Sequence, residues 1–104
     1  MTRSKSPAIT LIFWRDIPVQ VVAGAGDDVA RVALGVRFQQ AIDRAAMATG
    51  KTGTEDYLED WRRDSQPLVG DPQEAAEAAA AELEDRYPKA VLNLLVANGG
   101  FKES

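Results

Sequence analysis

The feature that most constrains the fold is an apolar stretch at residues 9–23, which is interrupted once by a polar turn. Residues 8–14 alternate in a way that places successive side chains on opposite faces of a β-strand. Arg15, Asp16 and Pro18 indicate a turn, because Asp can hydrogen-bond to its own backbone and Pro fixes φ. Residues 19–23 are expected to return as a second strand. The stretch therefore predicts an antiparallel hairpin on which the rest of the chain can pack.

A long helix is expected after the hairpin. The break at residues 24–26 is followed by Asp27 and Asp28, either of which can cap a helix that runs to about residue 49 and ends at Gly50. Its apolar residues form two overlapping stripes, which make a wider surface than a helix with one buried face needs. Gly35 inside this helix costs about 1 kcal/mol relative to alanine, which suggests close approach to another element.

A short helix and an edge strand are expected next. The helix begins at Thr52 or Thr54 and turns three side chains inward, those of Tyr57, Leu58 and Trp61. Residues 66–69 then predict an edge strand, because the proline at position 67 is tolerated in a sheet only at an edge.

The clearest helix boundary in the sequence is Asp71-Pro72, with Asp71 as the N-cap, Pro72 at the first helical position and Glu74 in the first turn. The alanine-rich helix that opens here ends or kinks at Pro88, and a last helix stops at residues 98–100. The predicted order is β-β-α-α-β-α-α. This is an α+β fold in which about four helices cover one face of a two- to three-stranded antiparallel sheet.

The chain is expected to form one domain at residues 8–100, between flexible tails at residues 1–7 and 101–104. Its 104 residues are enough to bury a core without cross-links. The apolar run at residues 8–14 is too short and wrongly flanked for a signal peptide or a membrane span. We therefore expect a cytoplasmic protein that has no membrane partner.

The amino-acid composition excludes the side chains that most often act in catalysis. The chain has no Cys and no His, which excludes disulfides, thiol catalysis, the commonest general base and the commonest metal ligand. Residues 24–28 lack the third glycine of a dinucleotide fingerprint and the Lys of a P-loop, so they read as a turn and a helix cap. The acids at positions 55, 56, 59 and 60 match no calcium loop and read as a solvated face. We therefore predict no catalytic residue, cofactor or metal site, although a minimal enzyme stays open.

Charge is distributed unevenly along the chain. The net charge of −4 argues against a nucleic-acid partner. Residues 55–86 carry eleven acids against three arginines, a net charge of −8, so the remainder carries +4. Such a polarised molecule is suited to interaction with a charged partner.

Two functional hypotheses follow. The first is a non-catalytic accessory module that binds a cytoplasmic protein through an exposed turn at Trp14, Arg15 and Asp16, with Trp61 as a further contact residue, because aromatic residues are enriched in interface hot spots. An ordinary hairpin turn is an equally good reading of residues 14–16, and aromatic residues in a domain of this size more often form its core.

The second hypothesis is a small-ligand-binding domain or minimal enzyme. Its pocket would lie between the hairpin and the long helix, where Arg15, Arg37 or Arg44 would bind an anionic group such as a folate or nucleotide tail.

Several segments resemble a known family in their order and spacing. They are residues 12–18, residues 38–47, Tyr57-Leu58 with Trp61-Arg62, and Asp71-Pro72 before the alanine-rich helix. Over residues 8–100 the chain is similar to the small bacterial "virulence factor" family, which is related to a module in conserved virulence factor C type proteins. The resemblance implies an association with folate- and corrinoid-linked one-carbon metabolism, and hence a metabolic enzyme as partner. It carries over no catalytic residues.

Overall fold

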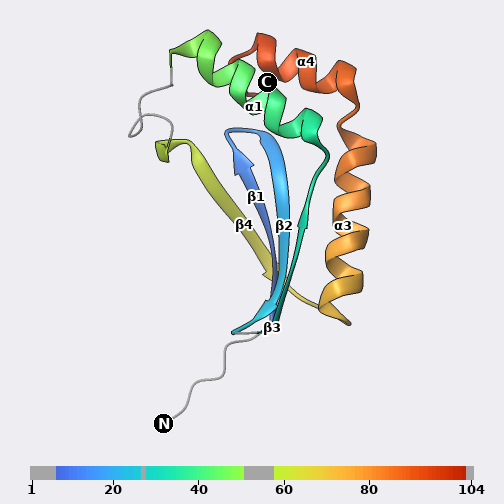
Figure 1. Ribbon diagram of the computed structural model, residues 1–104. Coiled ribbons are helices and arrows are strands. Elements are labelled where there is room, and N and C mark those ends of the chain that lie inside the picture. Colours follow the sequence, from blue (N-terminus) through green and yellow to red (C-terminus); the bar gives the residue numbers. More distant parts are fainter. Residues whose placement is uncertain (1–6, 27, 51–57, 103–104) are drawn as a thin grey trace.

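The computed structural model describes residues 7–26, 28–50 and 58–102 (Figure 1). In these ranges it contains four strands and three helices, in the order β1 (Ala8–Trp14), β2 (Ile17–Ala25), β3 (Asp28–Ala33), α1 (Val36–Thr49), β4 (Trp61–Pro67), α3 (Pro72–Arg86) and α4 (Lys89–Ala97). The α+β class is confirmed. The sheet has more strands and the described part fewer helices than the sequence predicted.

All neighbouring strands of the sheet are antiparallel, and their order is β3-β2-β1-β4. The predicted hairpin is present as β1 and β2, with a β-bulge between Ile12 and Phe13. The predicted edge strand is also present but begins earlier, at Trp61, and pairs with β1 along its whole length. Its residues 62–66 are polar, and all of residues 62–67 are exposed. This segment is therefore a strand because it pairs with β1. Its sequence lacks the alternation of apolar and polar residues that would identify a strand.

The prediction of a helix from Asp27 or Asp28 is wrong, because residues 28–33 form β3. Its apolar residues occur at spacings that fit one face of a helix, but the strand pairs along β2 from Ala25↔Asp28 to Gln20↔Ala33. The helix α1 begins only at Val36, with Gly35 as its N-cap. Its predicted end is confirmed: Gly50 is left-handed, and its N–H is directed to the carbonyl groups of the last helical turn.

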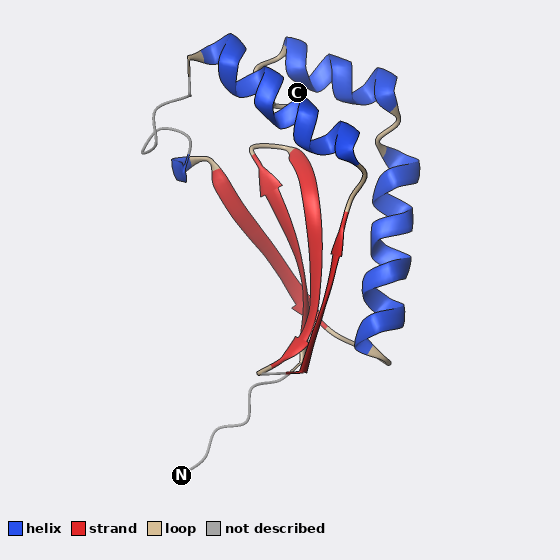
Figure 2. Cartoon of the chain, in the orientation of Figure 1, coloured by secondary structure: helices blue, strands red, loops and turns tan. Residues whose placement is uncertain are grey.

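Most of the predicted short helix lies outside the described residues, but Leu58 and Glu59 are helical, as predicted (Figure 2). Residues 51–57, including Tyr57, lie outside the described residues. The inward orientation expected of Leu58 is wrong, since this residue is 58% exposed. Trp61 belongs to β4 instead of a helix.

The boundary at Asp71 is confirmed. The carboxylate of Asp71 accepts a hydrogen bond of 3.0 Å from the N–H of Glu74, and Pro72 is the first residue of α3. After Pro88, the helix α4 begins at Lys89.

The helices leave part of the sheet uncovered. Helix α3 lies along one face of the sheet and packs on β2 and β3, but barely touches β1. Helices α1 and α4 lie side by side across the end of the sheet that holds the β1–β2 turn (Figure 2). The core lies beneath these helices, and its largest fully buried side chains are those of Trp14, Phe38, Ile17, Ile42 and Leu92. Among the residues that the structure describes, the helix-facing side of the β1–β4 pair therefore remains largely open.

Candidate functional site

The β1–β2 turn directs the side chain of Arg15 inward. Its backbone has a left-handed φ of 55°. The guanidinium Nε donates a hydrogen bond of 3.1 Å to Asp60 Oδ2, and Nη1 donates one of 2.5 Å to the carbonyl of Gly99. The guanidinium also lies 4.9 Å from the ring centre of Trp14 and 4.6 Å from that of Phe101. Only 8% of the Arg15 side chain is exposed.

Asp16 binds the same C-terminal segment. Its carboxylate accepts hydrogen bonds from the N–H of Lys102, at 2.7 Å, and from Arg62 Nη1, at 3.0 Å. Its own N–H donates to the carbonyl of Gly100, at 2.8 Å. Arg62 also donates to the carbonyl of Arg15. Burial raises the pKa of Asp16. The hydrogen bonds that its carboxylate accepts from Lys102 and Arg62, together with the positive charges of these two residues, outweigh that effect, so the pKa lies below its ordinary value.

We call residues 14–16, 60–62 and 99–102 the turn cluster. It brings together all four residues of the first hypothesis, since Trp61 pairs with Trp14 between β4 and β1. The expected exposure of the turn is wrong for Trp14, which is 0% exposed, and for Arg15. Residues 101 and 102 belong to this cluster, although the sequence placed them in a tail. Their contacts join positions about 85 residues apart, for which the sequence carries no local signal.

The arginines of the second hypothesis do not share a site. Arg37 donates from Nη1 to Glu84 Oε1, at 2.8 Å, and from Nη2 to the carbonyls of Glu84 and Tyr87, at 2.8 and 3.1 Å. Arg44 Nη1 donates to Asn93 Oδ1 at the surface, at 3.1 Å. Arg15 lies in the turn cluster, so each guanidinium already has partners of its own. Anion binding stays a prediction.

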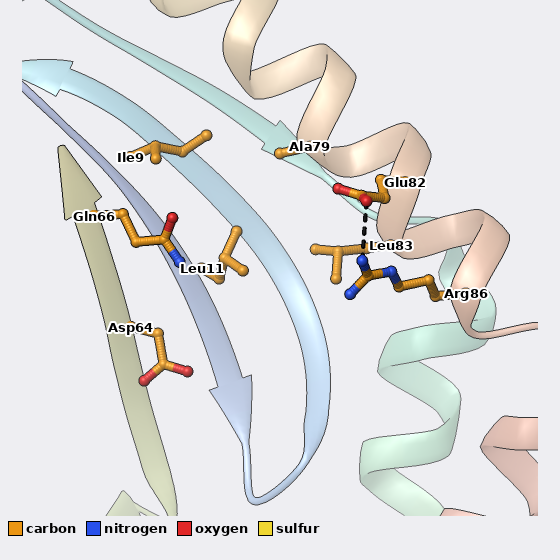
Figure 3. Close-up of a pocket in the computed structure, with 8 residues that line it drawn as sticks. All are labelled: Ile9, Leu11, Asp64, Gln66, Ala79, Glu82, Leu83 and Arg86. Atoms are coloured by element: carbon orange, nitrogen blue, oxygen red, sulfur yellow. Dashed lines mark hydrogen bonds and ion pairs between the residues drawn. The ribbon is translucent and has the colours of Figure 1, made fainter. Parts of the chain in front are cut away.

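A groove lies between α3 and the open side of the β1–β4 pair (Figure 3). It has a volume of about 270 Å³ and is lined by Ile9, Leu11, Asp64, Gln66, Ala79, Glu82, Leu83 and Arg86. Side chains from both walls point toward one another, and Arg86 forms an ion pair of 3.0 Å with Glu82. The sequence predicted a pocket beside the long helix α1, whereas this groove lies beside α3. Its position follows from the pairing of β4 with β1, which the polar sequence of β4 does not reveal.

Two negative findings concern the described ranges only. No group of three or more acidic, His or Cys side chains there could hold a metal ion. Within the same ranges no helix has the length and apolar character required to cross a membrane.

Comparison with models of known protein families shows to which family the chain belongs. The family model described as "Virulence factor" matches residues 12–96. The chain belongs to the virulence-factor family. No curated protein and no solved structure matches it significantly. The match to the virulence-factor family spans the β1–β2 turn and most of the groove, and it ends before residues 99–102 of the turn cluster. A family name of this kind specifies no reaction, so function has to be argued from the geometry.

Proposed function

We propose that this virulence-factor domain is a non-catalytic accessory module that binds another protein in the cytoplasm. The observation that carries the proposal is the open helix-facing side of the β1–β4 pair. Ile9 and Leu11 of β1 lie there, only partly buried, because α3 is displaced toward β2 and β3. Partly covered apolar side chains beside a groove are the usual features of a protein-binding surface.

The chemistry of the side chains supports a binding role. The chain contains no His and no Cys. In the turn cluster, Arg15 and Asp16 are engaged by partners within the domain, so they act as structural anchors. His is the commonest general acid or base in enzymes and Cys is an intrinsically strong nucleophile, so the absence of both from the sequence supports a binding role.

The resemblance of this domain to proteins associated with one-carbon metabolism sets the first partner class to test. We propose a folate-linked or corrinoid-linked metabolic enzyme, to which the module would bind without contributing catalytic groups.

Affinity capture of the tagged protein from its native lysate, followed by mass spectrometry, tests the proposal. We expect one partner protein in near-stoichiometric amount, absent from a tag-only control. Trp14 and Arg15 are unsuitable as test positions, because their substitution would disturb the core. Capture of no protein, together with thermal stabilisation by folates or nucleotides, would overturn the proposal and support the small-ligand hypothesis.

A further inference from the structure

We propose that the groove between α3 and the β1–β4 pair is the docking site for a basic amphipathic helix of the partner protein. This inference rests on the proposed function and specifies its surface and the kind of partner segment.

The first argument is shape. The groove has a volume of about 270 Å³, which is below the range of pockets that enclose a small organic ligand, about 300 to 1,000 Å³. Its apolar residues are Ile9 and Leu11 on the sheet and Ala79 and Leu83 on α3 (Figure 3). Because α3 covers β2 and β3, a second helix beside it would lie over β1 and β4. Such a helix would complete the layer that the sheet otherwise lacks.

The second argument excludes strand addition as the binding mode. An extended peptide could pair only along the outer edge of β4, which is the edge strand on this side of the sheet. That strand carries exposed charges at Arg62, Arg63 and Asp64 and ends at Pro67. Charged residues and proline on an edge strand oppose pairing with another chain. A helix, whose backbone hydrogen bonds are satisfied internally, avoids this obstacle.

The third argument is charge. Helix α3 forms one wall of the groove and carries five acids against one arginine. In the groove itself, the side chains of Asp64 and Glu82 are 53% and 63% exposed. Their ion pairs with Arg62 and Arg86 are surface pairs, which are weak and can be rearranged. In the lining, the carboxylates of Asp64 and Glu82 outnumber the guanidinium of Arg86 by one, and α3 as a whole carries a net charge of −4. This negative charge favours a partner helix that carries Lys or Arg beside its apolar face.

A model peptide provides the probe. A fluorescent helix of about 18 residues, with leucines on one face and lysines on the other, is titrated with the full chain and followed by anisotropy. The same peptide with glutamates in place of lysines is the control. We expect the lysine peptide to bind at least about tenfold more tightly. Equal binding of the two peptides would overturn the proposal.

Matched charge variants then locate the site. We expect the double variant Asp64→Lys and Glu82→Lys to weaken binding of the lysine peptide at least about tenfold. The control, Glu77→Lys with Asp85→Lys, makes the same change in net charge at α3 positions outside the groove lining. The affinity of this control variant for the lysine peptide should stay within about threefold of the wild-type affinity, because only the long-range electrostatic attraction is altered. Equal losses in both variants would show non-specific attraction and overturn the proposal.

Methyl NMR gives a readout that needs no substitution. Leu11 and Ile9 of β1 line the groove, whereas Ile12, one position from Leu11, faces the opposite side of the sheet. We expect the lysine peptide to shift the methyl signals of Ile9, Leu11 and Leu83, and to leave that of Ile12 in place. Shifts of equal size at Ile12, or none at Ile9, would overturn the docking site.

The native partner separates this inference from the proposed function. If the wild type and the Asp64→Lys, Glu82→Lys variant capture the same partner equally, the docking site is wrong and the accessory role stands. If the wild type captures no protein, the proposed function itself is wrong.

Discussion

Arg15 shows, at the scale of a single residue, how one side chain can connect distant parts of a small domain. Its guanidinium contacts Asp60 before β4 and Gly99 after α4, and it lies between the rings of Trp14 and Phe101. A planar guanidinium can donate several hydrogen bonds and stack on aromatic rings at the same time, which lysine cannot do. The left-handed φ of Arg15 is tolerated because these contacts stabilise the turn.

Replacing Arg15 with alanine should lower the free energy of unfolding by about 3 kcal/mol, because it removes two charged hydrogen bonds and leaves Asp60 partly buried without its cation. Urea denaturation measures the change. Arg44→Ala is the matched control: this side chain is exposed, makes one hydrogen bond to Asn93 and should cost about 0.5 kcal/mol or less. Equal effects of the two substitutions would contradict the anchoring role of Arg15.

Asp16 should make stability depend on pH in the acid range. Its folded pKa is below the ordinary value of 3.8, so its stabilising contribution is complete above that value and is lost as the pH falls through the lower folded pKa. The difference in unfolding free energy between the wild type and Asp16→Asn should therefore be constant above about pH 5 and shrink below about pH 4. Chemical denaturation at a series of pH values measures it. A difference that does not vary with pH would show that the carboxylate charge is unimportant.

At the scale of elements, the sequence predicted those parts of the fold that local chemistry determines. Asp71 and Gly50 mark helix ends because a capping carboxylate and a left-handed glycine act within one helical turn. Strands β3 and β4 could not be recognised in the same way. The spacing of apolar residues in β3 also fits a helix, and β4 is polar, so each exists through pairing with a strand that is distant or ambiguous in sequence.

The same distinction applies to the candidate site. The turn at Trp14, Arg15 and Asp16 was predicted to be an exposed contact for a partner, because an aromatic residue beside two charges is a local pattern. Its burial was not predicted, since residues 99–102 cover it from the far end of the chain. The groove depends on where β4 and α3 lie relative to each other, and no local pattern reports that arrangement.

The start of α1 is stabilised by another element. Glu84 of α3 accepts hydrogen bonds of 2.8 Å from the N–H of Gly35 and from Arg37, and so acts as a cap supplied by a neighbouring helix. Glu84→Gln should destabilise the protein by about 1 kcal/mol, because it removes the negative charge at the helix N-terminus. Thermal unfolding measures the change, with Asp85→Asn as the control, since this neighbouring acid does not cap α1 and its substitution should cost about 0.5 kcal/mol or less. Equal stability of the Glu84→Gln and Asp85→Asn variants would refute the capping role.

At the scale of the whole molecule, the C-terminal segment of the described chain closes one end of the sheet. The β1–β2 turn is covered by residues 99–102, while α1 and α4 lie beside it across the same end (Figure 1). Along the β1–β4 pair, by contrast, the described helices do not complete the layer, and this part of the sheet is left uncovered. The turn cluster therefore supplies rigidity at one end of the molecule, and the groove supplies an accessible surface along its side.

Truncation tests whether the turn cluster stabilises the whole fold. A chain that stops after Asn98 lacks the carbonyls of Gly99 and Gly100, the N–H of Lys102 and the ring of Phe101. With about 1 kcal/mol for each hydrogen bond, it should lose about 3 kcal/mol or more and melt more than about 12 °C lower. A chain that stops after Lys102 retains every one of these contacts and should melt with the full-length protein. Circular dichroism during heating measures both, and equal melting temperatures would show that the segment covers the turn without stabilising it.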